Sequence, residues 1–93
     1  MIKGFRDKDT ERTWNREPSK KFPVELQRMA LRKLVALDGA EALQDLRIPP
    51  GNRLEKLSGK RQGQLSIRIN DQWRICFMWK DGHAREVEIV EYH

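Results

Sequence analysis

Two neighbouring stretches in the C-terminal half alternate apolar and polar residues one for one. This period of two is typical of strands that bury one face. The apolar positions of the first stretch are Leu65, Ile67 and Ile69, and those of the second are Trp73, Ile75, Phe77 and Trp79. The pattern therefore predicts two adjacent strands that share a buried face.

The loop between these strands decides their register. A three-residue loop over residues 70–72 pairs Ile67 with Ile75, whereas a two-residue loop would set Ile67 against Arg74. The three-residue loop keeps the buried face apolar and places Arg68 directly opposite Arg74 on the other face. Like charges in this position destabilise a sheet, and a phosphate between two guanidinium groups would relieve the repulsion. Alternatively, each arginine turns aside to a carboxylate.

Helical periodicity is clearest over residues 23–38. Proline suits the start of such a helix, and Gly39 suits its end. One face carries the apolar residues Leu26, Met29, Ala30, Leu34 and Leu37, and we expect Leu31 and Val35 to widen it. Arg28 and Arg32 lie one turn apart on the outer side of the helix. They could contact a phosphate backbone, but an ordinary solvent-exposed helix surface is the favoured interpretation.

The N-terminal segment predicts smaller elements. Residues 1–5 suit a short strand, and Asp7 or Asp9 can cap a short helix that runs to about Asn15. Residues 15–21 are almost entirely polar, so we expect a mobile loop there.

A last strand is expected over residues 85–92, after the hairpin signal Asp81-Gly82. A two-residue turn would place Glu91 and His93 on the face of Arg74. A turn one residue longer would pair Ile75 with Ile89 and place Tyr92 on that face instead. The sequence leaves both registers open.

Three proton-exchanging side chains, Glu91, Tyr92 and His93, end the chain beside the strand of Arg74. Such groups next to cations suit general acid–base chemistry on a phosphodiester, although a frayed terminus would have the same sequence.

The 93 residues indicate a single domain, 1–93, with a net charge of +5. Residues 47–74 hold seven basic residues against two acidic ones, so the excess charge is concentrated beside the arginine pair. This favours a phosphate-bearing ligand such as a nucleic acid.

The chain has one cysteine and two histidines. We therefore expect no internal disulfide, no metal site and no cofactor, and a reducing, cytoplasmic location. No apolar run is long enough to cross a membrane, so no membrane association is expected.

The run from Pro49 to Phe77, the later V-E-I-V-E-Y-H and the opening M-I-K-G-F resemble the HigB toxins of the RelE superfamily. The resemblance covers nearly the whole chain. It implies an α+β fold, with a small twisted, mainly antiparallel sheet and two N-terminal helices packed on one face.

The resemblance also implies an activity, the ribosome-dependent cleavage of mRNA, which inhibits translation and growth. In this metal-independent reaction the 2′-hydroxyl attacks the adjacent phosphate and leaves a cyclic phosphate. By position, Arg68 and Arg74 would hold the scissile phosphate, and Tyr92 and His93 would orient the RNA or move protons. Glu91 stands where an aspartate is common.

A lysine of the family falls on Ser58 in this chain, and Lys56 or Lys60 could reach the same space. The RNA-binding residues expected from the basic segment are Arg53, Lys56, Lys60 and Arg61. The implied partner is a HigA-like antitoxin with a helix-turn-helix domain, and operator DNA would be bound only through that complex.

Two alternatives remain on the same sequence. A non-catalytic inhibitor could bind RNA or the ribosome through the same basic face without cutting. A gyrase-targeting toxin of the ParE type would share the fold, although the terminal Tyr92-His93 pair argues against it.

Overall fold

The computed structural model describes residues 1–92, so His93 lies outside the described residues. The α-helices are α1 (Lys8–Trp14) and α2 (Val24–Gly39). The strands are β1 (Glu55–Lys56), β2 (Leu65–Arg68), β3 (Trp73–Lys80) and β4 (His83–Glu91). Three 3₁₀ turns complete the elements: η1 (Leu43–Arg47), η2 (Pro50–Asn52) and η3 (Gly59–Arg61).

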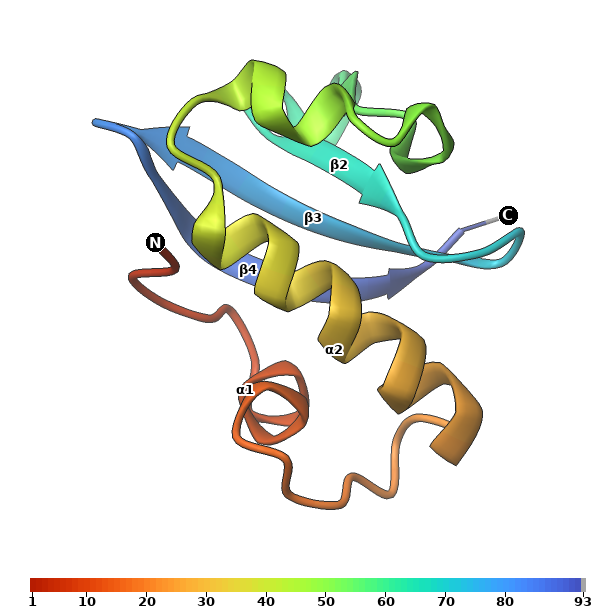
Figure 1. The fold of residues 1–93 in the computed structure, drawn as a ribbon. Helices are drawn as coiled ribbons and strands as arrows, with labels where there is room; N and C mark the ends of the chain where they lie inside the picture. Colours follow the sequence, from red (N-terminus) through yellow and green to blue (C-terminus); the bar gives the residue numbers. More distant parts are fainter. Residues whose placement is uncertain (93) are drawn as a thin grey trace.

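The strands form one antiparallel sheet in the order β1-β2-β3-β4. In Figure 1, α2 crosses in front of β3 and β4, with α1 beside it. The core lies between the helices and the sheet, and its main side chains are Leu26, Ala30, Leu34, Leu37, Ile67, Ile75, Phe77, Val87 and Ile89. This arrangement confirms the α+β fold with two N-terminal helices on one face.

The predicted register of β2 and β3 is confirmed. Ile67 pairs with Ile75, and Arg68 pairs with Arg74. The side-chain oxygen of Asn70 accepts hydrogen bonds from the backbone N–H groups of Gln72 and Trp73, both at 2.9 Å. The loop therefore closes on its own polar side chain, as turn asparagines often do.

The β3–β4 hairpin combines the two registers that the sequence left open. A two-residue turn pairs Lys80 with His83, and a bulge farther along shifts the register so that Ile75 pairs with Ile89. The bulge falls at Glu86, whose φ is +50°. The extra residue keeps β4's apolar side chains in the core and leaves Tyr92 on the side of Arg74.

The outer edge of β4 is covered by the N-terminal segment. In place of the short strand expected over residues 1–5, two isolated parallel bridges join Ile2 to Ala84 and Phe5 to Val87. Next along β4, the backbone N–H of Ile89 donates to the hydroxyl of Thr10 in α1 at 2.9 Å. These contacts satisfy the edge and fix α1 against the sheet.

The expectation that Val35 widens the buried face of α2 is wrong. Val35 is 48% exposed, because α2 contacts the sheet on one side and no described element covers its outer side. None of the helices in residues 1–92 has the length and apolar character needed to span a bilayer.

Candidate active site

The face of the sheet away from the helices carries a pocket of about 390 Å³, which we call the arginine pocket. It lies between segment 55–61 and strands β3 and β4. Its lining residues are Glu55, Lys56, Leu57, Ser58, Arg61, Cys76, Val90 and Tyr92. Arg74 lies at its edge, within reach of both Glu55 and Tyr92.

Arg74 is held in a fixed position. Its Nε donates to the hydroxyl of Ser66 at 2.8 Å, and its Nη2 donates to the carbonyl of Arg53 at 2.7 Å. The residue is only 6% exposed. Glu55 lies 3.9 Å from Nη2, too far for a hydrogen bond. Among the described residues, Nη1 has no hydrogen-bond partner, so this nitrogen is available to a ligand.

Tyr92 is placed against Arg74 by the end of β4. Its ring centre lies 5.4 Å from the Cζ of Arg74, a cation–π distance. Its backbone N–H donates to the carbonyl of Gln72 at 2.6 Å. The ring is half exposed, so the phenol borders the pocket and solvent together.

A second cation, Arg61, lies across the pocket. Its Nη1 donates to Gln64 and to the carboxylate of Glu88, both at 3.1 Å.

The pocket also contains the thiol of Cys76. Burial raises the pKa of this thiol; the charges of Arg61 and Arg74 oppose this effect, and Glu88 adds to it. A neutral, buried thiol lines the pocket and does not act as a nucleophile. Within residues 1–92, no three His, Cys, Asp or Glu side chains gather as a metal site would require.

Arg68 faces Arg74 across the strands but turns its side chain away. Its Nε donates to the carbonyl of Asn70 at 3.1 Å, and its Nη2 pairs with Asp71. Asp71 is almost fully exposed, and such ion pairs are weak. The alternative in which each arginine turns to a carboxylate therefore holds for Arg68, which pairs with Asp71. It does not hold for Arg74, which is buried and bonded to Ser66 and the carbonyl of Arg53.

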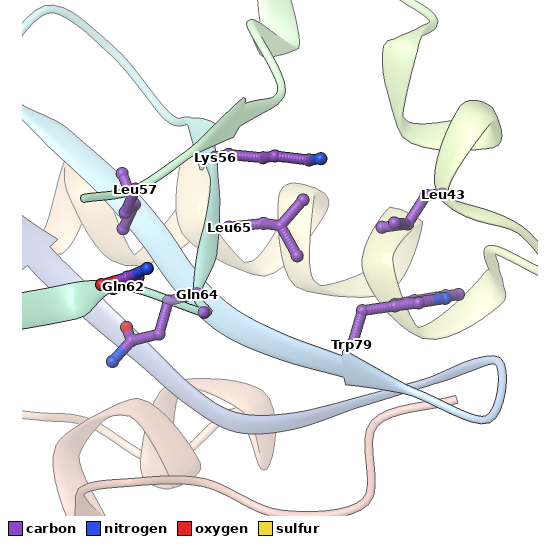
Figure 2. Close-up of a pocket in the computed structure, with 8 residues that line it drawn as sticks. Leu43, Lys56, Leu57, Gln62, Gln64, Leu65 and Trp79 are labelled. Carbon is purple, nitrogen blue, oxygen red and sulfur yellow. The ribbon is translucent and has the colours of Figure 1, made fainter.

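The structure brings three of the predicted residues together, namely Arg61, Arg74 and Tyr92. Lys56 borders the pocket, but it pairs with Leu65, so its side chain lies on the helix-facing side, beside Leu65 (Figure 2).

Glu91 is not among the residues that the structure brings together. It pairs with Trp73, on the helix-facing side by strand alternation, and accepts a hydrogen bond from Gln72.

The remaining predicted residues border the pocket or lie beyond it. Arg53 contributes its carbonyl to Arg74, and its own side chain is exposed. Lys60 is exposed in η3 and does not line the pocket. His93 lies outside the described residues.

Two anchoring side chains were not among the predicted site residues: Ser66, which holds Arg74, and Glu88, which holds Arg61. Ser66 could have been found, because the predicted register already places Ser66 two pairs from the Arg68–Arg74 pair, on the same face. Glu88 could not, since its position depends on the bulge in β4.

A second pocket, of about 410 Å³, lies at the other end of β2. Figure 2 shows Leu43, Leu65 and Trp79 around it, with the side chain of Lys56 extending beside Leu65. Lys56 is its only charged lining residue. This pocket has one cation and no arginine, so the arginine pocket is the better candidate for phosphodiester chemistry.

Comparison with known proteins agrees with the fold and the sequence. The heterotetrameric YoeB-YefM toxin-antitoxin complex of Staphylococcus aureus contains a chain of the same fold, with a TM-score of 0.62 over 100% of this chain and 98% of that chain at 16% identity. At this identity the likeness concerns the fold. Residues 3–93 match the family described as the RelE-like toxin of type II toxin-antitoxin system HigB. The chain belongs to this HigB-like toxin family.

Two curated relatives support the assignment. Toxin HigB-1 of Vibrio cholerae is 44% identical over 85 residues, which cover 90% of each chain. Endoribonuclease HigB of Proteus vulgaris is 29% identical and aligns over 100% of both chains.

Proposed function

We propose that this toxin is an endoribonuclease that cuts mRNA on translating ribosomes and thereby arrests translation and growth. The observation that carries the proposal is the convergence of Arg61, Arg74 and Tyr92 around one pocket. The name of the Proteus vulgaris relative, an endoribonuclease, supports it.

Arg74 is assigned to the scissile phosphate. Its contacts with Ser66 and Arg53 fix the guanidinium before substrate arrives, and Nη1 is left to donate to a phosphate oxygen. A donor held in place stabilises the charge that develops in the transition state without reorganising. Arg68 can exchange its exposed partner Asp71 for the same phosphate.

In the proposed reaction the ribose 2′-oxygen forms a bond to phosphorus, and the bond from phosphorus to the 5′-oxygen breaks. The products carry a 2′,3′-cyclic phosphate and a 5′-hydroxyl. A base must take the 2′-hydroxyl proton, and an acid must protonate the leaving oxygen. We assign these roles to Tyr92 and His93, and we assign Glu91 to holding the C-terminal segment through Gln72.

The remaining basic residues are assigned to RNA binding. Lys56 is assigned to a flanking phosphate, because it pairs with Leu65 and its side chain lies on the face away from Arg74. Arg53 and Lys60 are exposed and suit flanking phosphates of mRNA or ribosomal RNA.

The partner proposed for this toxin is an antitoxin of the HigA type with a helix-turn-helix domain. The family supports a partner of this kind, because its members are toxins of type II toxin-antitoxin systems. Their complex would bind operator DNA through the antitoxin, and the toxin would act in the cytoplasm, where messages are translated.

The test uses purified protein, translating ribosomes and a defined mRNA, with wild type, Arg74→Lys and His93→Ala compared. Loss of an oxyanion donor or a general acid–base group lowers rates by about 10²-fold or more. Lys80→Ala, on an exposed residue at the end of β3, is the control and should cut like wild type. An intact message under complete translational arrest would overturn the nuclease proposal.

That outcome would support a second candidate, a non-catalytic inhibitor that binds RNA or the ribosome. Ser58 favours it, because this serine lines the pocket where the family carries a lysine. The inhibitor would still need Arg74 for binding, so Arg74→Lys would relieve the arrest.

A further inference from the structure

The outer side of α2 carries a second apolar stripe, formed by Val24, Leu31 and Val35. Spacings of seven and four residues place these side chains on one line of the helix. Val24 is 71% exposed and Val35 is 48% exposed, while Leu31 is half-buried. Isolated exposed valines need no explanation, but a continuous apolar line indicates a contact surface.

The stripe forms the floor of a groove. Two pockets of about 340 and 460 Å³ adjoin along it and share Arg16, Arg28 and Leu31. We call the whole feature the α2 groove. It runs from Val24 to Val35, about 16 Å at the rise of an α-helix.

Cations dominate the rim of the α2 groove. Arg16, Arg28 and Arg32 line it, against a single carboxylate, Glu17. In residues 1–92, neither Arg28 nor Arg32 forms an ion pair with a carboxylate of the chain. The rim is thus complementary to a negatively charged ligand.

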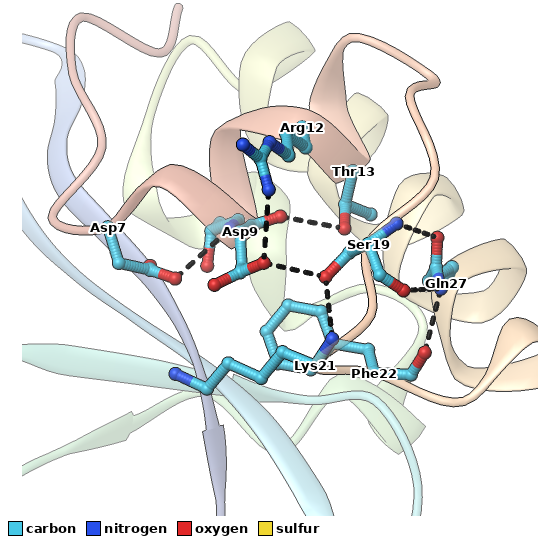
Figure 3. Close-up of polar contacts among 9 residues, drawn as sticks. Asp7, Asp9, Arg12, Thr13, Ser19, Lys21, Phe22 and Gln27 are labelled. Atoms are coloured by element: carbon cyan, nitrogen blue, oxygen red, sulfur yellow. Dashed lines mark hydrogen bonds and ion pairs between the residues drawn. The ribbon is translucent and has the colours of Figure 1, made fainter.

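One wall of the α2 groove is fixed by hydrogen bonds. Figure 3 shows Ser19 at the centre of this network, between α1 and α2. Its hydroxyl donates to Asp9 at 2.8 Å, and the amide of Gln27 donates to the carbonyls of Ser19 at 3.0 Å and Phe22 at 2.7 Å. Polar contacts thus hold a segment with little apolar area to bury, and the groove exists before any partner arrives.

We propose that the α2 groove docks an acidic amphipathic helix of the antitoxin, which rests on the antitoxin partner proposed above. To fit the floor of the groove, the partner helix needs apolar side chains at helical spacing. To fit the rim, it needs carboxylates beside them. The length of the groove matches about three helical turns. A nucleic acid would use the arginines but would leave the apolar stripe without a partner.

The α2 groove lies on the far side of the helix layer from the arginine pocket. The core face of α2 and the sheet separate the two sites. The docked helix therefore leaves Arg74 uncovered.

The test measures binding of purified toxin to the protein encoded by the adjacent gene, by titration calorimetry. Two groove variants are used: Val35→Asp, and the double variant Arg28→Glu with Arg32→Glu. The control with the same charge change is Lys80→Glu with Arg85→Glu, on exposed residues outside the groove. Thermal denaturation verifies that each variant is folded.

We expect both groove variants to bind at least tenfold more weakly and the control to stay within twofold of wild type. Added salt should weaken binding of wild type more than binding of the arginine double variant. Unchanged affinity in both groove variants would overturn the proposal, as would a failure of wild type to bind the adjacent protein.

The mRNA cleavage assay, run on the same variants, separates this proposal from the proposed function. Normal cleavage with weakened binding supports both. Loss of cleavage with unchanged antitoxin affinity would show that the groove contacts ribosomal RNA, and would overturn the docking proposal. If wild type cuts nothing, the nuclease proposal fails while the binding result still decides the groove.

Discussion

Removing the Ser66 hydroxyl should reveal how strongly the fold holds Arg74. In Ser66→Ala, the Nε of Arg74 loses an acceptor 2.8 Å away. Ser66 is 0% exposed and Arg74 is 6% exposed, so water cannot readily replace the hydroxyl. A buried hydrogen bond to a charged group contributes about 1.5–3 kcal/mol, so we expect a loss of about 2 kcal/mol.

For a domain of 93 residues, that loss lowers the melting temperature by roughly 8–16 °C. Urea denaturation at neutral pH, with the slope constrained to be equal, measures the free energy directly. Ser58→Ala is the matched control, because Ser58 is exposed and caps no helix through its side chain. It should change stability by less than about 0.5 kcal/mol.

The same variant should lower mRNA cleavage, mainly in kcat, because Arg74 would be less well positioned for the transition state. If Ser66→Ala were as stable as Ser58→Ala, the hydrogen bond would not hold Arg74 in solution. The preorganisation argument for the arginine pocket would then be refuted.

Three further predictions concern other parts of the fold. Asn52→Ala should destabilise by about 2 kcal/mol in urea denaturation, because Asn52 is 1% exposed and donates to the carbonyl of Leu46 at 3.1 Å; a neutral result would contradict this. Ser19→Ala should speed trypsin cleavage within residues 15–21, and unchanged digestion would show that its hydroxyl does not fix the loop. Burial raises the pKa of Cys76 above its ordinary value of 9.0. The stability due to the protonated thiol is therefore complete below pH 9.0 and is lost as pH rises through the folded-state pKa. Between pH 7.5 and 10 wild type should lose more stability than Cys76→Ala, and equal losses would contradict the assignment.

The sequence predicted most of the sheet because its apolar alternation allowed few registers. Only a three-residue loop keeps Ile67 and Ile75 on one face, and the structure has that pairing. The β3–β4 register was undecided for a physical reason. The Asp81-Gly82 turn and the apolar positions of β4 demand registers that differ by one residue, and the bulge at Glu86 satisfies both.

Side-chain positions in the arginine pocket were harder to predict. The sequence placed Arg68 opposite Arg74, but the local contact with Asp71 turns Arg68 away. The strand β1 was also missed, because two residues carry no periodicity, yet it helps to build the pocket wall around Lys56. On α2, Val35 was expected to be buried, because periodicity alone does not show which row of apolar side chains packs on the sheet.

The central claim is that the arginine pocket directs attack of a 2′-hydroxyl on the message held in the ribosome. The most direct measurement maps the product ends of a defined mRNA after incubation with the toxin, with and without translating ribosomes. The account predicts cuts within the decoding site only, with 5′-hydroxyl and 2′,3′-cyclic phosphate ends that are lost in Arg74→Lys. Products with 5′-phosphate ends, or equal cutting of free RNA, would contradict it.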